Sequence, residues 1–317
     1  MTDRTPAQYA ITPLWKMRLR LFARTSRQNW SLFWESRIGP VGLLIIGLFL
    51  LAMVAHPILI STVWEPRVYD PVMGFDRALI GRHPAPPSWS HPLGTDPIGR
   101  DVLSQLMWSA RSAFALGVTA AVISVVIGTL IGAVCAYFGG VVDVVFMRLA
   151  DLVMLFPFIA LLMVLRSVLP LTLIRLALIL GALSGLGGIT IVLKSQALTV
   201  KVKPYIEAAR VAGGGSWHII RRHIIPNIMP LTFLYMMFNV TAAIFTEAVL
   251  SFFGFLDIRM SWGVMINTAQ QAGYLGAFGH YWWLWAPAGA AITLLCFAFY
   301  LVGRGLDAVV NPRLRRR

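Results

Sequence analysis

Five long stretches of this sequence contain no charged residue. They run between Arg37 and Glu65, Arg111 and Asp143, Arg175 and Lys194, Arg222 and Glu247, and Arg259 and Arg304. A helix needs roughly 20 mostly apolar residues to cross about 30 Å of hydrocarbon. Only 13% of all residues are charged and 58% are hydrophobic, a composition that excludes a soluble domain and a disordered chain. We therefore expect an integral membrane protein.

A sixth apolar stretch, Val144–Leu165, carries Arg148 and Asp151. These two residues lie three apart and share a helix face, so their side chains are expected to pair. The sequence thus predicts an all-α integral membrane protein with six transmembrane helices. Their expected positions are Val41–Val63, Phe114–Tyr137, Val144–Leu165, Arg175–Leu193, Met229–Phe252 and Trp282–Val302.

Basic residues are divided unevenly between the two sides of such a bundle. The segment before the first span, the loop between spans four and five, and the C-terminal tail together hold 18 Lys and Arg, against eight in the opposite loops. Short cytoplasmic segments collect Lys and Arg. Both termini are therefore predicted to be cytoplasmic.

The spans also predict the order of segments along the chain. A cytoplasmic N-terminal segment would include an interfacial helix near Leu14–Trp34, where aromatic and basic residues are mixed. The expected segments are this N-terminal one (1–40), the first span (41–63), an external loop (64–111), a core of five further spans (112–303) with a cytoplasmic loop at 194–228, and a basic tail (304–317).

The net charge of +14 raises the question of a nucleic-acid partner. The basic residues lie beside the predicted spans rather than in one block, so topology and anionic membrane lipid explain them more simply, and no nucleic-acid partner is expected. Cys135 and Cys296 fall inside spans and are expected to be packing residues. The sequence predicts no metal site and no catalytic residues.

The sequence contains no phosphate-binding loop of the Walker A type. That loop needs a lysine directly after a glycine, because backbone amides and the ammonium hold the phosphates together. The four lysines instead follow Trp15, Leu193, Val200 and Val202. Any ATP-driven process would therefore need an ATPase on another chain.

The predicted loop between spans four and five has a distinctive pattern. Pro204 suits the first turn of a short helix, and Gly213 can end that helix in a left-handed conformation. Ser216 is the expected N-cap of a second helix ending near Pro226. Spacing alone favours two interpretations equally, a docking element for another protein and an ordinary connector.

This loop resembles the EAA loop of permease subunits of bacterial binding-protein-dependent ABC importers. The resemblance rests on Glu207-Ala208-Ala209, on Gly213 after three further residues, and on Pro226 after twelve more. In such permeases the loop docks onto the ATP-binding subunit. Glu207 is expected either to pair at that interface or to be an exposed first-turn carboxylate.

A second stretch resembles the signature of one branch of these permeases, the C-type subunit of the dipeptide/oligopeptide/nickel group. It comprises His91-Pro-Leu-Gly94-Thr-Asp96-Pro-Ile-Gly99-Arg100-Asp101. Further matches are Tyr137–Gly140 with Asp143, Glu247–Gly254, Ser261–Gly263 and Leu306–Leu314. Two departures are Ile225 in place of leucine before the proline, and Gly213-Gly214-Gly215 in place of a single glycine, which is expected to soften the docking turn.

The resemblance implies the ABC importer permease fold and a division of labour between chains. A second, B-type permease would complete the pathway. Two ATP-binding subunits, which hold ATP and Mg²⁺, would dock on the EAA loop, and an external solute-binding protein would deliver the cargo. This chain would bind no cofactor and lie in the bacterial inner membrane. The implied cargo is a dipeptide or oligopeptide, with nickel chelates and oligosaccharides as alternatives.

Two acidic residues predicted to lie inside spans, Asp151 and Glu247, are candidates for the pathway, because a charge in lipid is costly and often functional. For Asp151 we favour the alternative that its side chain pairs with Arg148. For Glu247, a position at the mouth of the pathway and a role in capping the end of its span are equally favoured. The external loop is expected to help to seat the binding protein, with charge reversal at Asp96 and Asp101 as the test.

Two other classes of function are weaker alternatives. An ion-coupled secondary transporter should show paired broken helices and several carboxylates at midplane, whereas this chain offers only Asp151 and Glu247. A membrane enzyme would need a clustered catalytic or metal set. The resemblance therefore decides in favour of the importer permease.

Overall fold

The computed structural model describes residues 30–277 and 279–310 of the chain. In these ranges all regular structure is helical, apart from one isolated bridge between Thr95 and Asp101. The all-α membrane fold expected from the sequence is confirmed. The segments long and apolar enough to cross a membrane are α2 (Ile38–Thr62), α4 (Val102–Phe138), α7 to α8 (Leu173–Lys201), α10 to α11 (Ser216–Phe252) and α13 (Ala286–Val310).

Shorter helices lie between these spans. The loop after α2 contains α3 (Pro66–Tyr69) and the turn η1 (Arg77–Leu79), α9 (Pro204–Val211) follows α8, and α12 (Trp262–Gln271), η4 (Tyr274–Ala277) and η5 (Trp282–Leu284) precede α13. The sixth span begins at Ala286 rather than at Trp282, because the backbone of Trp285 leaves helical geometry with φ −123°.

The third predicted span is not one continuous helix, so that prediction was wrong. α5 (Gly140–Leu155) and α6 (Phe158–Val168) are bent by 86° at a short break. The cause is Pro157, whose ring disfavours helical geometry at the preceding residue. Phe156 is accordingly extended, with ψ 133°.

The fourth span is also irregular, within a continuous path. α7 (Leu173–Ser184) passes through a wide turn, η2 (Gly185–Ile189), into α8 (Thr190–Lys201). Gly187 in this turn has φ −86° and ψ −126°, which is not helical. The Thr190 hydroxyl donates to the carbonyl of Gly185 over 2.5 Å. The Thr190 hydroxyl thus supplies the carbonyl of Gly185 with a hydrogen-bond donor at the point where the helix is irregular.

The fifth span is longer than expected because the second loop helix merges with it. α10 (Ser216–Ile219) continues through the wide turn η3 (Ile220–Ile224) into α11 (Ile225–Phe252), so no helix ends near Pro226 as predicted. Pro226 has no N–H for the carbonyl four residues earlier, and its ring crowds that carbonyl. The wider turn immediately before it accommodates both effects.

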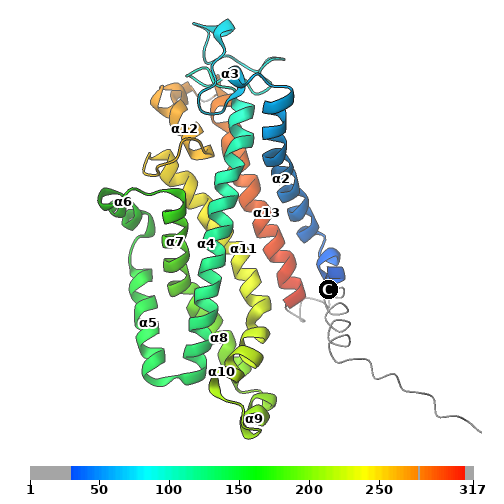
Figure 1. The fold of residues 1–317 in the computed structure, drawn as a ribbon, viewed down its shortest axis with the longest axis vertical. Helices are drawn as coiled ribbons and strands as arrows, with labels where there is room; N and C mark the ends of the chain where they lie inside the picture. The colour runs from blue at the N-terminus through cyan, green and yellow to red at the C-terminus, as the bar shows by residue number, and fades with distance from the viewer. Residues whose placement is uncertain (1–29, 278, 311–317) are drawn as a thin grey trace, which may run out of the picture.

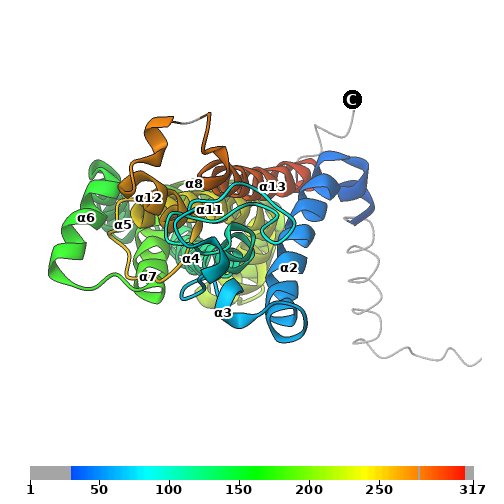
Figure 2. The same ribbon diagram turned by 90° about the horizontal axis from the view of Figure 1, so that it is seen from above.

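α4 is the central helix and packs against α2, α7, α8 and α11 (Figure 1; Figure 2). Small residues permit this close approach. A Cβ on Gly132 would stand 2.8 Å from the backbone nitrogen of Lys194, and one on Gly185 would stand 2.8 Å from the carbonyl oxygen of Ser124. The spans therefore pack closely on α4 because these positions are glycine.

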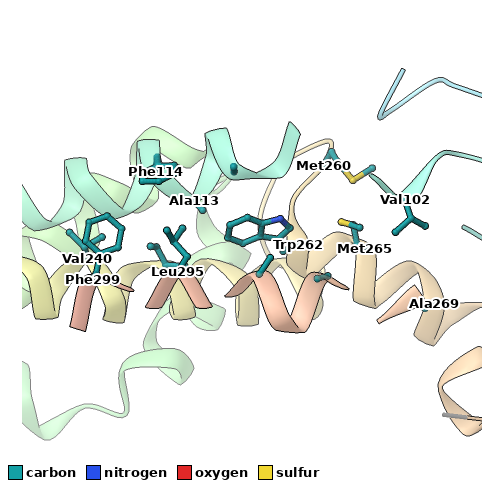
Figure 3. Packing of buried hydrophobic residues seen from close by; sticks show 14 of the residues in the cluster. Val102, Ala113, Phe114, Val240, Met260, Trp262, Met265, Ala269, Leu295 and Phe299 are labelled. Atoms are coloured by element: carbon teal, nitrogen blue, oxygen red, sulfur yellow. The ribbon is translucent and has the colours of Figure 1, made fainter. Parts of the chain in front are cut away.

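The largest apolar core lies between α4, α11, α12 and α13. Figure 3 shows the indole of Trp262 within this core, beside Ala113, Leu295 and Met265. Its Nε1 donates to the carbonyl oxygen of Leu106 over 3.0 Å. The first turn of α12 is thereby fixed against α4.

The two ends of the bundle differ. The start of α2, α9 and the end of α13 lie at one end, and the loop containing α3 lies at the other (Figure 1). This arrangement brings the described parts of the three basic segments to one end. The predicted interfacial helix lies outside the described residues except from Trp30 onward, and most of the basic tail lies outside them too. The side of the membrane that each end faces stays a prediction.

Candidate functional site

The helix α9 contains Glu207, Ala208 and Ala209 and is fixed by one buried residue. Ile206 is 1% exposed and is the buried side chain of this helix. Its apolar cluster comes from α4, α8 and the α10 to α11 segment and includes Ala133, Ala136, Ala197, Val200, Ile219, Ile220, Ile224 and Ile228. One isoleucine therefore joins α9 to three spans.

The rest of α9 is open to solvent. Glu207 and Ala208 are exposed, Ala209 is half-buried, and Val211 is 85% exposed. Trp217, at the start of the next helix, is also exposed. Exposed apolar side chains next to alanines leave a surface that another protein backbone can approach closely.

The turn after α9 is ordered by its glycines. Gly213 has φ +85°, the left-handed conformation predicted for it, and its N–H donates to the carbonyl of Arg210 over 3.0 Å. A Cβ on Gly214 would lie 2.7 Å from the carbonyl oxygen of Ala209, which its own N–H binds at 2.9 Å. Gly215 is the N-cap of α10, so Ser216 is the first helical residue and not the N-cap as predicted. Two of the three glycines thus fulfil specific backbone requirements.

The segment Tyr137–Asp143, singled out from the sequence, lies beside this loop. The guanidinium of Arg210 stands 5.9 Å from the centre of the Tyr137 ring. Lys194 Nζ lies 2.5 Å from Asp143 Oδ1, which joins α8 to the first turn of α5. Pro226, exposed on the first turn of α11, completes the EAA pattern. The turn from α4 to α5 and the loop around α9 are therefore linked.

At the opposite end, His91 and Asp101 of the external signature form a buried pair. His91 Nδ1 lies 2.8 Å from Asp101 Oδ2, and His91 Nε2 lies 3.1 Å from Asp76 Oδ2. Asp101 also caps α4, because its Oδ1 accepts from the Ser104 N–H over 2.7 Å. Ionised carboxylates only accept hydrogen bonds, so the imidazole donates from both nitrogens and carries a positive charge.

The same contacts shift the acid–base equilibria. The hydrogen bond to Asp101 raises the pKa of His91 above its usual 6.5; burial opposes this rise, and Asp76 reinforces it. For Asp76, burial alone would raise the pKa, but hydrogen bonds from His91 and from the Ala78 N–H outweigh it and leave the pKa lowered. His91 and Asp76 therefore stabilise each other in their charged forms.

Asp96 organises the remainder of the signature. Its Oδ1 accepts from the backbone N–H groups of Ile98 and Arg100, each over 2.9 Å. Its Oδ2 accepts from Arg100 Nε at 2.7 Å and from the Gln105 amide at 2.9 Å. Gly94 and Gly99 have φ values of +76° and +93° and supply the turns. All six residues of the predicted signature are thus brought together.

The carboxylates of Asp96 and Asp101 are buried and fully engaged in these contacts. They lie beneath the surface, so reversing their charges would disrupt the folded loop before it tested a docking contact. The seating of a binding protein on this loop stays a prediction that needs surface substitutions.

The two acidic residues of the spans have different surroundings. Arg148 Nη1 and Asp151 Oδ2 lie 3.4 Å apart, with both side chains exposed on α5. Glu247 is buried, and its Oε1 accepts from the Ser251 hydroxyl over 2.9 Å. A Cβ on Gly263 would lie 2.7 Å from the Cβ of Ser251, so the segments around Glu247 and Ser261 pack closely. The Glu247 and Ser261 motifs therefore meet at the start of α12.

Comparison with known proteins identifies the family. Residues 124–316 match the model of the family described as the inner membrane component of binding-protein-dependent transport systems. The chain belongs to this family. It is 37% identical to the dipeptide transport system permease protein DppC of Bacillus subtilis (strain 168) over 239 residues, which cover 73% of this chain and 71% of that protein.

Two further relatives cover more of the chain. The oligopeptide transport system permease protein OppC of Bacillus subtilis (strain 168) is 32% identical over 288 residues, 90% of this chain and 88% of that protein. A putative peptide permease protein of Brucella suis biovar 1 (strain 1330) is 32% identical over 284 residues, 89% of each chain. These matches identify the chain as a multi-pass membrane permease of an ABC transporter complex.

This permease also contains a polar group that sequence reasoning missed. Ser184, Tyr235 and Asn239 lie around cavities between α7, α8 and α11. The search for spans counted charged residues, and none of these three is charged. The presence of Asn239 within a long apolar stretch was the feature of the sequence that could have indicated this polar group.

Proposed function

We propose that this chain is a permease subunit of an ATP-driven importer of peptides. The proposal is supported by the names of its relatives, which are permeases of dipeptide, oligopeptide and peptide transport systems. The dipeptide permease is 37% identical to this chain, and the other two relatives are each 32% identical. ATP and Mg²⁺ would be held by partner subunits, because a permease of this family acts as the membrane component.

In the full assembly this chain would contact four kinds of neighbour. A second, B-type permease completes the pathway, two ATP-binding subunits dock at α9, and an external solute-binding protein docks over the loop after α2. The complex lies in the bacterial inner membrane, surrounded by lipid. Both termini, with α9, face the cytoplasm.

The observation that carries this proposal is the exposure of α9. One side chain, Ile206, is buried among three spans, and the remaining surface is open. ATP binding would move the docked subunit, and the Ile206 contact would transmit that motion to α4, α8 and α11. The link between Lys194 and Asp143 extends it to α5. The mechanism is rigid-body coupling through a docked element.

Co-purification of the complex from its native membrane tests this docking role. Val211→Asp places a charge on the exposed face of α9, and Val141→Asp is the matched control, because Val141 is exposed on the first turn of α5. We expect Val211→Asp to reduce recovery of the ATP-binding subunits about tenfold, the change produced by about 1.4 kcal/mol of binding free energy. The second permease should still be recovered with both variants. Equal recovery of the ATP-binding subunits with both variants would contradict docking at α9.

Cargo is tested separately on the purified complex. ATP hydrolysis should be stimulated by the cognate binding protein loaded with a dipeptide or an oligopeptide. Stimulation confined to a nickel chelate or an oligosaccharide would replace peptide as the cargo and leave the docking role intact.

A further inference from the structure

The break in the fourth span lies against two open cavities on the side of the bundle. A cavity of about 370 Å³ is lined by Ser184, Gly188, Tyr235 and Asn239 among others. A second cavity, of about 220 Å³, is lined by Ser184, Gly187 and Gly188 together with residues of α5 and α6. Both cavities are therefore bounded by the non-helical backbone at η2.

Non-helical backbone at membrane depth has a physical requirement. Its free N–H and C=O groups cannot face lipid, so such segments occur where they are buried in protein or line a water-filled cavity. A Cβ on Gly188 would meet no atom of the described chain within 4 Å, so this glycine borders open space. The break at η2 thus indicates a hydrated cavity wall rather than a lipid-facing surface.

Three side chains on the same wall support this conclusion. The Ser184 and Tyr235 hydroxyls and the Asn239 amide form no hydrogen bond within the described part of the chain. By contrast, the Thr129 and Thr232 hydroxyls, on α4 and α11, lie within hydrogen-bond distance of each other at 3.1 Å. Unpaired polar groups in an apolar medium are costly, so these three are expected to have a partner outside this chain.

The wall contains neutral polar groups among apolar side chains and no charged group. Of the described residues, no Asp, Glu, Lys or Arg lines either cavity or the smaller one of about 130 Å³ that shares Ser184 and Asn239 with them. A surface with neutral donors and acceptors can bind groups that all peptides share, namely main-chain amides, and does not select a side-chain charge.

We propose that Ser184, Gly188, Tyr235 and Asn239 form the wall of the pathway that contacts the cargo, and that this wall hydrogen-bonds the main chain of the passing peptide. The inference rests on the proposed function and adds the residues and the mode of recognition. Asn239 offers both a donor and an acceptor, which matches a peptide group. Lipid is a poor alternative occupant because acyl chains leave these polar groups unpaired.

The test uses the complete complex in liposomes, with a saturating concentration of loaded binding protein. The probes are radiolabelled tri-alanine, Ala-Lys-Ala and Ala-Glu-Ala. Gly188→Phe fills the cavity, and Gly47→Phe is its matched control, because Gly47 is an exposed glycine within α2 that also has open space around it. Asn239→Leu removes the hydrogen bonds, and Thr293→Leu on the exposed face of α13 is its control.

We expect Gly188→Phe and Asn239→Leu each to lower tri-alanine uptake at least about fivefold, the effect of losing roughly one hydrogen bond. The two controls should transport normally, and ATP hydrolysis should still respond to the binding protein. Asn239→Lys gives the decisive measurement, because it should slow Ala-Lys-Ala more than Ala-Glu-Ala. Such charge discrimination requires contact with the cargo and is not expected of a purely structural role.

Several results would overturn the inference. Equal uptake of the three peptides by Asn239→Lys would exclude cargo contact at this residue. Loss of the second permease from Gly188→Phe or Asn239→Leu complexes would show that the wall is a subunit interface instead. Absence of peptide uptake by the wild-type complex would refute the proposed function itself, and so it is distinguishable from failure of the wall.

Discussion

The imidazole of His91 lies 2.8 Å from the carboxylate of Asp101, and both side chains are almost wholly buried. Asp101 is also the N-cap of α4, the central helix of the bundle. The outer loop is therefore joined to the start of this helix through one carboxylate, with a positive charge on its partner.

This pair makes the stability of the outer loop depend on pH. The pKa of His91 is raised in the folded protein. Its contribution to the stability of the loop is therefore fully present below pH 6.5, the usual pKa, and is lost as the pH rises through the pKa of the folded state. Because the pKa of Asp76 is lowered, its contribution is present above its usual 3.8 and is lost as pH falls. The protection factors of amides 76–105, which compare hydrogen exchange with the intrinsic rate at each pH, should be highest between these limits.

The control for this pH dependence is His280, an exposed histidine near the same end of the bundle. His91→Asn should remove the loss of protection at high pH, whereas His280→Asn should leave it unchanged. Wild-type protection factors that stay constant from pH 6 to 9 would contradict the charged state assigned to His91.

Removal of the Asp101 carboxylate should destabilise the protein. Asp101→Ala removes a helix cap and leaves the buried His91 without its closer partner, at a cost of about 2–4 kcal/mol in the free energy of unfolding. Asp151→Ala removes an exposed pair and should cost less than about 1 kcal/mol. Thermal unfolding of the purified variants measures both, and similar shifts in midpoint would contradict the structural role of Asp101.

The turn after α9 should be sensitive at Gly213 and tolerant at Gly215. Gly213→Ala forces a side chain into the left-handed region, at a cost of about 1–2 kcal/mol. Gly215 has φ −66° and no atom within 4 Å of a Cβ, so Gly215→Ala should be nearly neutral. Limited proteolysis of residues 210–218 should be faster in the first variant only. Equal cleavage of both would mean that the triple glycine is loose, as its sequence suggested.

Packing of α4 on α8 should not tolerate a side chain at Gly132. Gly132→Val would place atoms against the backbone of Lys194 and should cost about 1–3 kcal/mol through overpacking. Gly47→Val, with no neighbour within 4 Å, is the control. The yield of folded protein in detergent extracts should fall for the first variant alone.

The spans could be predicted from sequence because burying a charge in lipid is costly, so gaps between charged residues mark them. Gaps between charged residues do not reveal whether the helix within a span is continuous or broken. This criterion took Phe156-Pro157 as part of a helix, although Pro157 was a visible reason for a break. It also missed the irregular turn at Gly187, where the non-helical backbone depends on its packing within the folded bundle.

The site was predicted in part for a similar reason. The EAA pattern located α9 because the left-handed turn at Gly213 and the proline at its start are local requirements. The burial of Asp96 and Asp101 depends on partners elsewhere in the loop, such as Asp76, whose approach is set by the fold. Because these residues are acidic, the sequence suggested that their side chains lie on the surface, whereas in the folded loop they are buried.

The hydrogen bond from Trp262 to Leu106 also bears on how the protein is made. The two residues are 156 positions apart, so the carbonyl oxygen of Leu106 can accept this hydrogen bond only after the three spans between α4 and Trp262 have been synthesised. During that interval the outer end of α4 lacks the core that the α12 indole completes. The apolar surface at this end of the nascent protein is therefore accessible to assembly factors and proteases. It becomes covered only after Trp262 has left the ribosome.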